Sequence, residues 1–225
     1  MFGYRNPATG RIEGFDIDLA REIARALFGD PDRIELVPID SAERVPVLRD
    51  KRVDLVAHTF AATCERRREV EFSATYFVTS QRILAVRGGP VRGAADLTGR
   101  RVCGVFGTTT LEPVFALPGP PTVLGMTNWL DCLVALQQGQ VDAISTDAPI
   151  LVGLAEQDPH LELVGEPMAV DSYALGVRKD QPEFVRFVNA VLERVRADGT
   201  WERLYAARMA ALGPSPGPPA PRYLD

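Results

Sequence analysis

The chain has 225 residues, of which 46% are hydrophobic and 24% are charged, and its formal net charge at pH 7 is −5. This length accommodates one large domain or two small lobes, each with a core of its own. The negative charge argues against nucleic acid as a partner, because binding to phosphates needs a positively charged surface. No apolar run approaches the roughly 18 residues that span a bilayer.

Helical and strand patterns alternate along the first half of the chain. Apolar side chains spaced by three and four residues follow Gly14 and Asp16, and Gly29 ends that first helix. In chain order the predicted elements are a helix over 17–28, a strand over 34–39, a helix capped by Ser41, a strand over 53–57, a polar loop over 59–66 followed by a short helix, and a strand over 82–87.

The alternation begins again after Gly88 and Gly89. The predicted elements are then a strand over 102–106, a loop over 107–110, a helix start over 111–115, a strand over 122–124, a helix capped by Asn128, a strand over 141–146, a helix opened by Asp147 and Pro149, strands over 161–164 and 173–178, and helices over 183–196 and 201–212. Residues 214–221 are rich in proline and are expected to join no core.

A short internal repeat in the sequence supports an organisation into two lobes. Leu48, five residues and the sequence VDLV recur as Leu136, five residues and the sequence VDAI. Each copy is a helix that turns into a strand, and polar residues stand at the far end of that strand. Two α/β units that aim strand ends at a shared space would form a cleft between lobes.

The segment from Thr59 to Phe77 is the most informative for function. It places several hydroxyl groups and Arg66 where a strand ends and a short helix begins. Small ligands of open α/β sheets dock at the carboxyl ends of strands. Backbone N–H groups at a helix start, together with a guanidinium group, suit a carboxylate. The segment therefore predicts a pocket for a small acid, with an amino acid favoured.

Six short motifs occur in an order typical of one known family. They are Gly14–Leu19 (GFDIDL), Val53-Asp54, Cys64-Glu65-Arg66 with Val70–Ser73, Gly107–Thr110 (GTTT), Val141–Ala143 with Thr146-Asp147, and Asp198–Trp201 with Tyr205. With them the chain resembles the periplasmic amino-acid-binding proteins of polar amino acid ABC transporters, solute-binding protein family 3, of the glutamine/glutamate-binding type. The resemblance covers nearly all of residues 2–212.

The resemblance implies an α/β fold of the two-lobed periplasmic-binding-protein type II, with a hinged cleft between the lobes. Lobe 1 would comprise residues 1–77 and 174–212, lobe 2 residues 78–173, and residues 213–225 a proline-rich tail. Family members begin with a strand before the residues that match Phe2, and this first strand of lobe 1 is missing here. We therefore expect the strand and an export signal upstream of Met1, which would place the protein outside the cytoplasm, in the periplasm or at the cell surface, with a lipoprotein anchor as one option.

The resemblance assigns the acid end of the ligand to the loop after residue 57. Arg66 would hold the α-carboxylate through two parallel hydrogen bonds. Thr59 matches the position whose backbone carbonyl group takes the α-ammonium group in relatives. Ala61 matches a position that is often Thr or Ser, so only its backbone N–H group would bind the carboxylate. The arginines that follow Arg66 would lie on a solvated face.

On the second lobe the resemblance points to three residues. Asp147 would face the α-ammonium group, and the alternative is that it caps the following helix. Thr108 and Thr109 would offer hydroxyl and amide donors to the carboxylate at a helix start, and the alternative is an ordinary Gly-Thr turn and cap.

Arg44 bears on the type of ligand. Residues 41–44 (SAER) resemble the matching segment of glutamate- and aspartate-binding relatives, whereas glutamine binders carry an aromatic residue near Ser41. A second arginine in the cleft would neutralise a side-chain carboxylate, which favours glutamate or aspartate over glutamine or asparagine. The alternative is a surface arginine on a helix.

Cysteine and histidine patterns predict no metal site and no cofactor. Cys64, Cys103 and Cys132 show no CxxC spacing, and the two histidines stand apart. Cys103 falls on a predicted strand and Cys132 near the start of a helix in the same part of the chain, so they are the candidate disulfide in an exported protein. The alternative is three buried thiols.

Three functions compete. The first is a monomeric solute-binding protein that hands a small-molecule amino acid to an ABC transporter permease. The second is a sensory module that binds the same ligand. The third is an enzyme on the same fold, similar to cyclohexadienyl dehydratases, because fold alone does not fix function. No Ser-His-Asp or Cys-His set can be assembled from two isolated histidines, so we expect no catalytic residues and favour the first function.

Overall fold

The computed structural model describes residues 1–223 and divides into two compact units. Unit 1 comprises Met1–Ile39, Glu43–Val78 and the chain from Ser172 onward, and unit 2 comprises Asp40–Ala42 and Thr79–Asp171. The lobe boundaries predicted from the sequence follow residues 77 and 173, whereas the units change after Val78 and Asp171, and residues 40–42 were not assigned to lobe 2. Among the described residues, no helix combines the length and the apolar character needed to cross a membrane.

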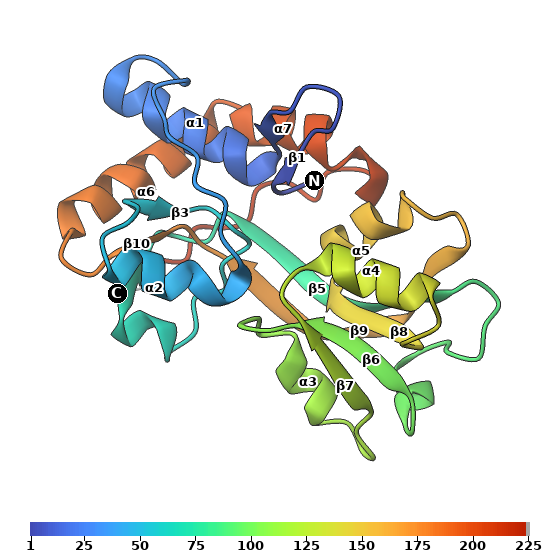
Figure 1. Ribbon diagram of the computed structural model, residues 1–225. Coiled ribbons are helices and arrows are strands. Elements are labelled where there is room, and N and C mark those ends of the chain that lie inside the picture. The colour runs from blue at the N-terminus through green and yellow to red at the C-terminus, as the bar shows by residue number, and fades with distance from the viewer. Residues whose placement is uncertain (224–225) are drawn as a thin grey trace. The chain divides into compact units, whose positions relative to one another are not determined.

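Unit 1 combines a small antiparallel sheet with helices (Figure 1). Its elements are β1 (Tyr4–Arg5), β2 (Ile12–Glu13), α1 (Phe15–Phe28), α2 (Arg44–Arg49), β3 (Leu55–Val56), a 3-10 turn (Arg66–Arg68), β4 (Val70–Phe72), β10 (Gly176–Arg178), α6 (Pro182–Ala197), α7 (Thr200–Arg208) and a 3-10 turn (Ala210–Leu212). A further 3-10 turn, Ser41–Glu43, precedes α2. Strand β10 pairs with both β3 and β4, and β1 pairs with β2.

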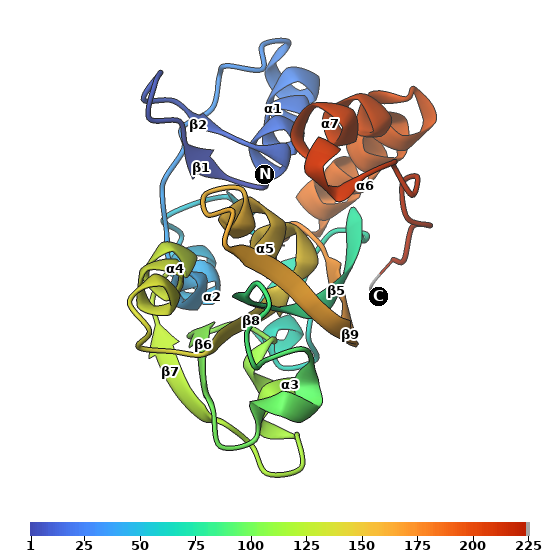
Figure 2. The same ribbon diagram turned by 90° about the vertical axis from the view of Figure 1, so that its right-hand side faces the viewer.

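The core of unit 1 is rich in aromatic rings. Helices α1, α6 and α7 lie side by side (Figures 1 and 2) and enclose Phe15, Tyr76 and Trp201, which are all almost fully buried. The indole N–H group of Trp201 donates to the carbonyl oxygen of Tyr76 at 2.8 Å. Since a buried indole needs such a partner, this bond fixes the chain on both sides of Tyr76 against α7.

Unit 2 is a five-stranded mixed sheet with helices on both faces (Figure 1). Its elements are β5 (Phe77–Val86), a 3-10 turn (Ala94–Leu97), β6 (Arg101–Val105), α3 (Leu111–Phe115), β7 (Thr122–Met126), α4 (Trp129–Gln137), β8 (Ala143–Asp147), α5 (Ala148–Ala155) and β9 (Leu161–Tyr173). The strand order is β7-β6-β8-β5-β9, in which β6 runs parallel to β7 and β8, and β5 runs antiparallel to β8.

Neighbouring residues of the central strands face opposite cores, as the two-residue period of a strand requires. On β5, Leu84 packs in the cluster that contains residues of α4 and α5, while Ile83 packs in the cluster that contains Val114 of α3. Strands β5, β6 and β8 therefore each bury apolar side chains on both faces of the sheet.

Two sequence predictions are corrected here. Residues 34–39 were expected to form a strand, yet within the described residues they have no ladder partner and remain an extended connection. Two separate strands were expected over 161–164 and 173–178, but β9 runs unbroken over 13 residues, and β10 follows as a short strand. Strand β9 contains Pro167, which it tolerates because it lies at the edge of the sheet.

The proline-rich tail was expected to join no core, but its end contacts unit 1. The backbone N–H group of Thr75 donates to the carbonyl oxygen of Arg222 at 3.4 Å, and the hydroxyl group of Tyr223 bonds to the carboxylate of Glu193 on α6. Both contacts are hydrogen bonds, and the core clusters of the described residues contain no residue of the tail.

A disulfide joins Cys103 on β6 to Cys132 on α4, the pair that the sequence favoured, and Cys64 is free and exposed. The two cysteines of the disulfide are 29 residues apart in the sequence.

We expect Cys132→Ala to lower the free energy of unfolding by about 3 kcal/mol, because the loop that the disulfide closes gains entropy in the unfolded chain once the disulfide is absent. Urea unfolding measures the change. Cys64→Ala is the matched control and should unfold as the wild type does; an unchanged midpoint for Cys132→Ala contradicts the prediction.

Candidate functional site

The turn at Thr59 is the centre of the polar cluster in unit 1. Thr59 has a φ angle of 42°, in the left-handed region that a β-branched residue rarely adopts. Its backbone N–H group donates to Oδ2 of Asp16 at 2.8 Å, and its carbonyl oxygen accepts from Nη1 of Arg44 at 3.0 Å. The two main-chain polar groups of one residue are thus held by side chains of opposite charge.

Asp16 is positioned by the start of α1. Gly14 precedes the helix with a φ angle of 141°, and a Cβ atom there would lie 2.1 Å from the carbonyl oxygen of Phe2. Only glycine permits this approach. The chain then places Asp16, which is 1% exposed, beside Tyr76, whose hydroxyl group donates to Oδ1 at 2.6 Å.

Burial dominates the ionisation of Asp16. Desolvation raises the pKa of this carboxyl group from 3.8 to about 6, and the hydrogen bonds from Tyr76 and Thr59 oppose the rise only in part. The pKa of the Tyr76 hydroxyl group is also raised well above its usual value, because that group is buried and faces a carboxylate. Tyr76 therefore remains a hydrogen-bond donor at neutral pH.

Arg44, the first residue of α2, is buried in the same cluster. Its Nη1 atom donates to the carbonyl oxygens of His58 and Thr59, at 3.0 Å each. Desolvation, and next the positive charge of Arg66, lower the pKa of Arg44 to about 9, so it is still a cation at neutral pH. Arg44 was weighed against a surface arginine in the sequence analysis, and a residue that is 3% exposed does not fit that alternative.

Arg66 shares an aromatic neighbour with Arg44. The two guanidinium carbons lie 4.8 Å (Arg44) and 5.1 Å (Arg66) from the ring centroid of Phe60. Nη1 of Arg66 donates to the carbonyl oxygen of Ala61 at 2.7 Å, and its backbone N–H group donates to Oγ1 of Thr63. The loop after β3 thus fixes two arginines around one buried ring, in an arrangement that suits an anion.

His58 lies next to this arginine pair but carries no charge at neutral pH. Burial, and then the charge of Arg44, lower its pKa to about 4. Its Nδ1 atom is buried without a hydrogen-bond partner among the described residues. His58 therefore adds no positive charge to the cluster.

Unit 2 places Asp147 at the end of β8. The residue pairs in register with Gln81 of β5 and is 4% exposed. It stands at the N-cap position of α5, yet its side chain makes no capping bond to that helix within the described chain. The capping role that the sequence analysis weighed as the alternative is therefore not the one that the carboxylate adopts.

The hydroxyl groups of Thr108 and Thr109 bond within unit 2. Oγ1 of Thr108 donates to the carbonyl oxygen of Val105 at 2.7 Å and lies 3.0 Å from Oγ1 of Thr110. Oγ1 of Thr109 donates to Oδ2 of Asp171 at 2.7 Å. Each hydroxyl group has one proton, so these bonds leave the backbone N–H groups as the donors that the pair could offer to a carboxylate.

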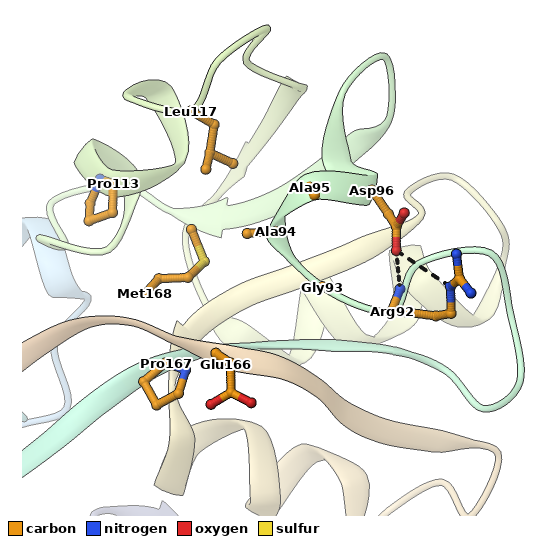
Figure 3. A pocket seen from close by; sticks show the side chains of 10 residues that line it. All are labelled: Arg92, Gly93, Ala94, Ala95, Asp96, Pro113, Leu117, Glu166, Pro167 and Met168. Atoms are coloured by element: carbon orange, nitrogen blue, oxygen red, sulfur yellow. Dashed lines mark hydrogen bonds and ion pairs between the residues drawn. The ribbon is translucent and has the colours of Figure 1, made fainter.

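A separate hollow of about 610 Å³ lies in unit 2 (Figure 3). Its lining includes Pro113, Leu117 and Met168, and none of the predicted ligand residues. At its rim Arg92 and Asp96 bond to each other, as the dashed lines in Figure 3 mark. A mostly apolar wall with a self-paired arginine does not suit a small zwitterion, so we place the candidate site at the residues above and not in this hollow.

The sequence analysis named Arg66, Thr59, Ala61 and Arg44, which the structure brings together in unit 1, and Asp147, Thr108 and Thr109, which lie in unit 2. Asp16 and Tyr76, which bond to each other beside Thr59, were not among the predicted site residues. Within the described chain no group of three or more histidine, cysteine, aspartate or glutamate side chains could hold a metal ion.

Comparison with known proteins defines first the class and then the family. The fold is that of the type II periplasmic binding proteins: an ancestral arginine-binding protein bound to arginine superposes with a TM-score of 0.85 at 30% identity, covering 92% of this chain and 91% of that one. A mutant of the arginine-binding protein of T. maritima superposes with a TM-score of 0.86 at 28% identity, with coverage of 93% and 90%.

The chain belongs to the bacterial extracellular solute-binding proteins, family 3, whose pattern matches residues 1–208. It is 34% identical over 206 residues to the ABC transporter glutamine-binding protein GlnH of Bacillus subtilis, covering 91% of this chain and 76% of the relative. It is 33% identical over 215 residues to the glutamate-binding protein GluB of Corynebacterium glutamicum, covering 90% and 72%.

Proposed function

We propose that this protein is an extracytoplasmic solute-binding protein that captures a polar amino acid and delivers it to an ABC permease. The observation that carries the proposal is the pair of guanidinium groups around Phe60. The positive charge of Arg66 lowers the pKa of the buried Arg44 guanidinium group, because the two cations beside Phe60 repel each other. An anionic ligand relieves that repulsion and gains charge-assisted hydrogen bonds.

An amino acid also needs a partner for its ammonium group. Asp147 suits this role, because it is a buried carboxylate whose side chain does not cap α5 within the described residues. The carbonyl oxygen of Thr59 is a second candidate, since a carbonyl oxygen has two lone pairs and Arg44 is one donor to it.

We infer glutamate or aspartate as the preferred ligand, over glutamine or asparagine. The relatives do not decide this, since GlnH is named for glutamine and GluB for glutamate. In this proposal Arg66 binds the α-carboxylate of the ligand. The buried cation Arg44 would neutralise a side-chain carboxylate, and a side-chain amide has no charge for it to neutralise.

A thermal-shift screen of the twenty amino acids tests the proposal. A ligand at 100 times its Kd stabilises the folded state by about 2.7 kcal/mol, which for a chain of this size raises Tm by roughly 5–10 °C. We expect the largest shifts from glutamate and aspartate. If glutamine gives the largest shift, the function stands and the ligand preference is wrong; if no amino acid raises Tm, the function is wrong.

A further inference from the structure

Thr59 joins two charged side chains through its own main-chain N–H and C=O groups. Asp16 accepts from the N–H group of Thr59, and the carbonyl group of Thr59 accepts from Arg44. Asp16 lies 43 residues before Thr59 in the sequence, so it belongs to a different element, α1. Asp16 has no place among the ligand residues proposed above, yet it reaches the turn that presents them.

The conformation of Thr59 requires such an anchor. A threonine with a φ angle of 42° is strained, and strained residues persist only where their surroundings hold them. The two bonds at 2.8 and 3.0 Å are the ones that hold this residue. If the turn relaxed, the carbonyl oxygen of Thr59 would move away from Nη1 of Arg44, and the guanidinium group would lose one of the contacts that orient it.

We propose that Asp16 is a positioning residue of the amino-acid site: its carboxylate fixes the Thr59 turn and through it the orientation of Arg44. The proposal rests on the function proposed above. It assigns no ligand contact to Asp16. It requires that amino-acid affinity depend on the charge of the Asp16 carboxylate, although this group does not contact the ligand.

Protonation of Asp16 offers a way to test this dependence. The groups that act electrostatically on Asp16 are Tyr76, Arg44 and the amino group of Met1, besides the N–H group of Thr59. Because the backbone N–H group of Thr59 can only donate, an added proton on Asp16 must sit on the oxygen that faces Tyr76, whose hydroxyl group then accepts. The bond to Thr59 loses its charge assistance, which roughly halves its strength.

The sign of the pH effect follows. Burial raises the pKa of Asp16 to about 6 in the folded protein, above its ordinary value of 3.8. Ionised Asp16 therefore costs the folded state stability: the stabilisation from the neutral form is present at low pH and is lost as the pH rises through about 6. Affinity should change in the opposite direction, since it needs the ionised carboxylate, and should fall as the pH drops through about 6.

Asp16→Asn separates the two effects, because asparagine keeps the shape and mimics the protonated acid. We expect wild-type affinity for glutamine and for glutamate, measured by calorimetry, to fall about tenfold from about pH 8 to about pH 5. Asp16→Asn should bind at the low value at both pH values, while its Tm at pH 8 is equal to or above that of the wild type. Both pH values lie above the pKa of His58, which is about 4, so His58 does not contribute.

Two further variants make the test specific. Asp18→Asn is the matched control: Asp18 lies two residues after Asp16 on α1 and pairs with Arg208, so this variant should follow the wild-type pH profile. Tyr76→Phe removes a hydrogen bond that lowers the pKa of Asp16, so the midpoint of its affinity profile should move to higher pH.

The outcomes distinguish this inference from the proposed function. If the wild type binds no amino acid at either pH, the proposed function fails. If the wild type binds and Asp16→Asn keeps its affinity and pH profile, the positioning role is wrong. The role is also wrong if Asp16→Asn binds an acidic ligand more tightly, because removal of a negative charge near the arginines would then outweigh the loosened turn. A loss of affinity that is matched by a lower Tm at pH 8 would make Asp16 only structural.

Discussion

Arg66→Ala is expected to reduce amino-acid affinity about a thousandfold, or about 4 kcal/mol. The guanidinium group of Arg66 is held beside Phe60 by a 2.7 Å bond to the carbonyl oxygen of Ala61. It is therefore oriented before a ligand arrives, and a carboxylate bound to it gains two charge-assisted hydrogen bonds at little entropic cost. Isothermal calorimetry with the best ligand of the amino-acid screen measures the loss.

The fold should survive this substitution. Arg66 is only partly buried, and the loss of its bond to Ala61 should cost about 1 kcal/mol of stability. Arg68→Ala is the matched control, because Arg68 stands in the same 3-10 turn and is exposed. Affinity close to that of the wild type in Arg66→Ala would refute the assignment. An equal loss in both variants would attribute binding to net charge and not to a directed contact.

The helices of this protein were the most predictable elements. The apolar spacing after Gly14 predicted a helix over 17–28, and α1 spans Phe15–Phe28. The cap at Asn128 was also predictable from local sequence, since its side chain accepts from the N–H group of Asp131. Both signals are local, because a helix bonds to itself and shows its buried face as a period of 3.6 residues.

Strands were less predictable, since a strand depends on a partner far along the chain. Residues 34–39 have a strand-like composition but no neighbour to pair with in the described structure. The predicted strand ended at residue 164, whereas β9 continues through Pro167, which an edge strand of the unit 2 sheet tolerates. Pairing order is a property of the whole fold, and residue patterns carry little of it.

Some residues of the candidate site could be predicted from local sequence, and others could not. Arg66 and Asp147 follow strands in recognisable motifs, so sequence order was enough to name them. Asp16 was noted at the start of the first helix but not as a site residue, because in the sequence it is an ordinary acidic residue in the first turn of a helix. Its partner Tyr76 is 60 residues away, and only the folded chain shows that the two meet behind Thr59.

Arg44→Ala is expected to discriminate between ligands. We predict that affinity for glutamate falls about a thousandfold, because the side-chain carboxylate would be buried without a cation. Affinity for glutamine should fall only about tenfold, through the loss of the bond from Nη1 to the carbonyl oxygen of Thr59. Calorimetric titration of both amino acids into the same variant gives the ratio directly.

The ratio separates two roles that the structure combines in one side chain. Arg44 supports the turn through the carbonyl oxygens of His58 and Thr59, and it brings a buried positive charge to the site. Loss of support should affect every amino acid alike, whereas loss of charge should affect the acidic ones most. Arg52→Ala, which removes an exposed arginine shortly after α2, should change neither affinity. Equal losses for glutamate and glutamine in Arg44→Ala would mean that Arg44 only supports the turn, and the preference for an acidic ligand would then lose its physical basis.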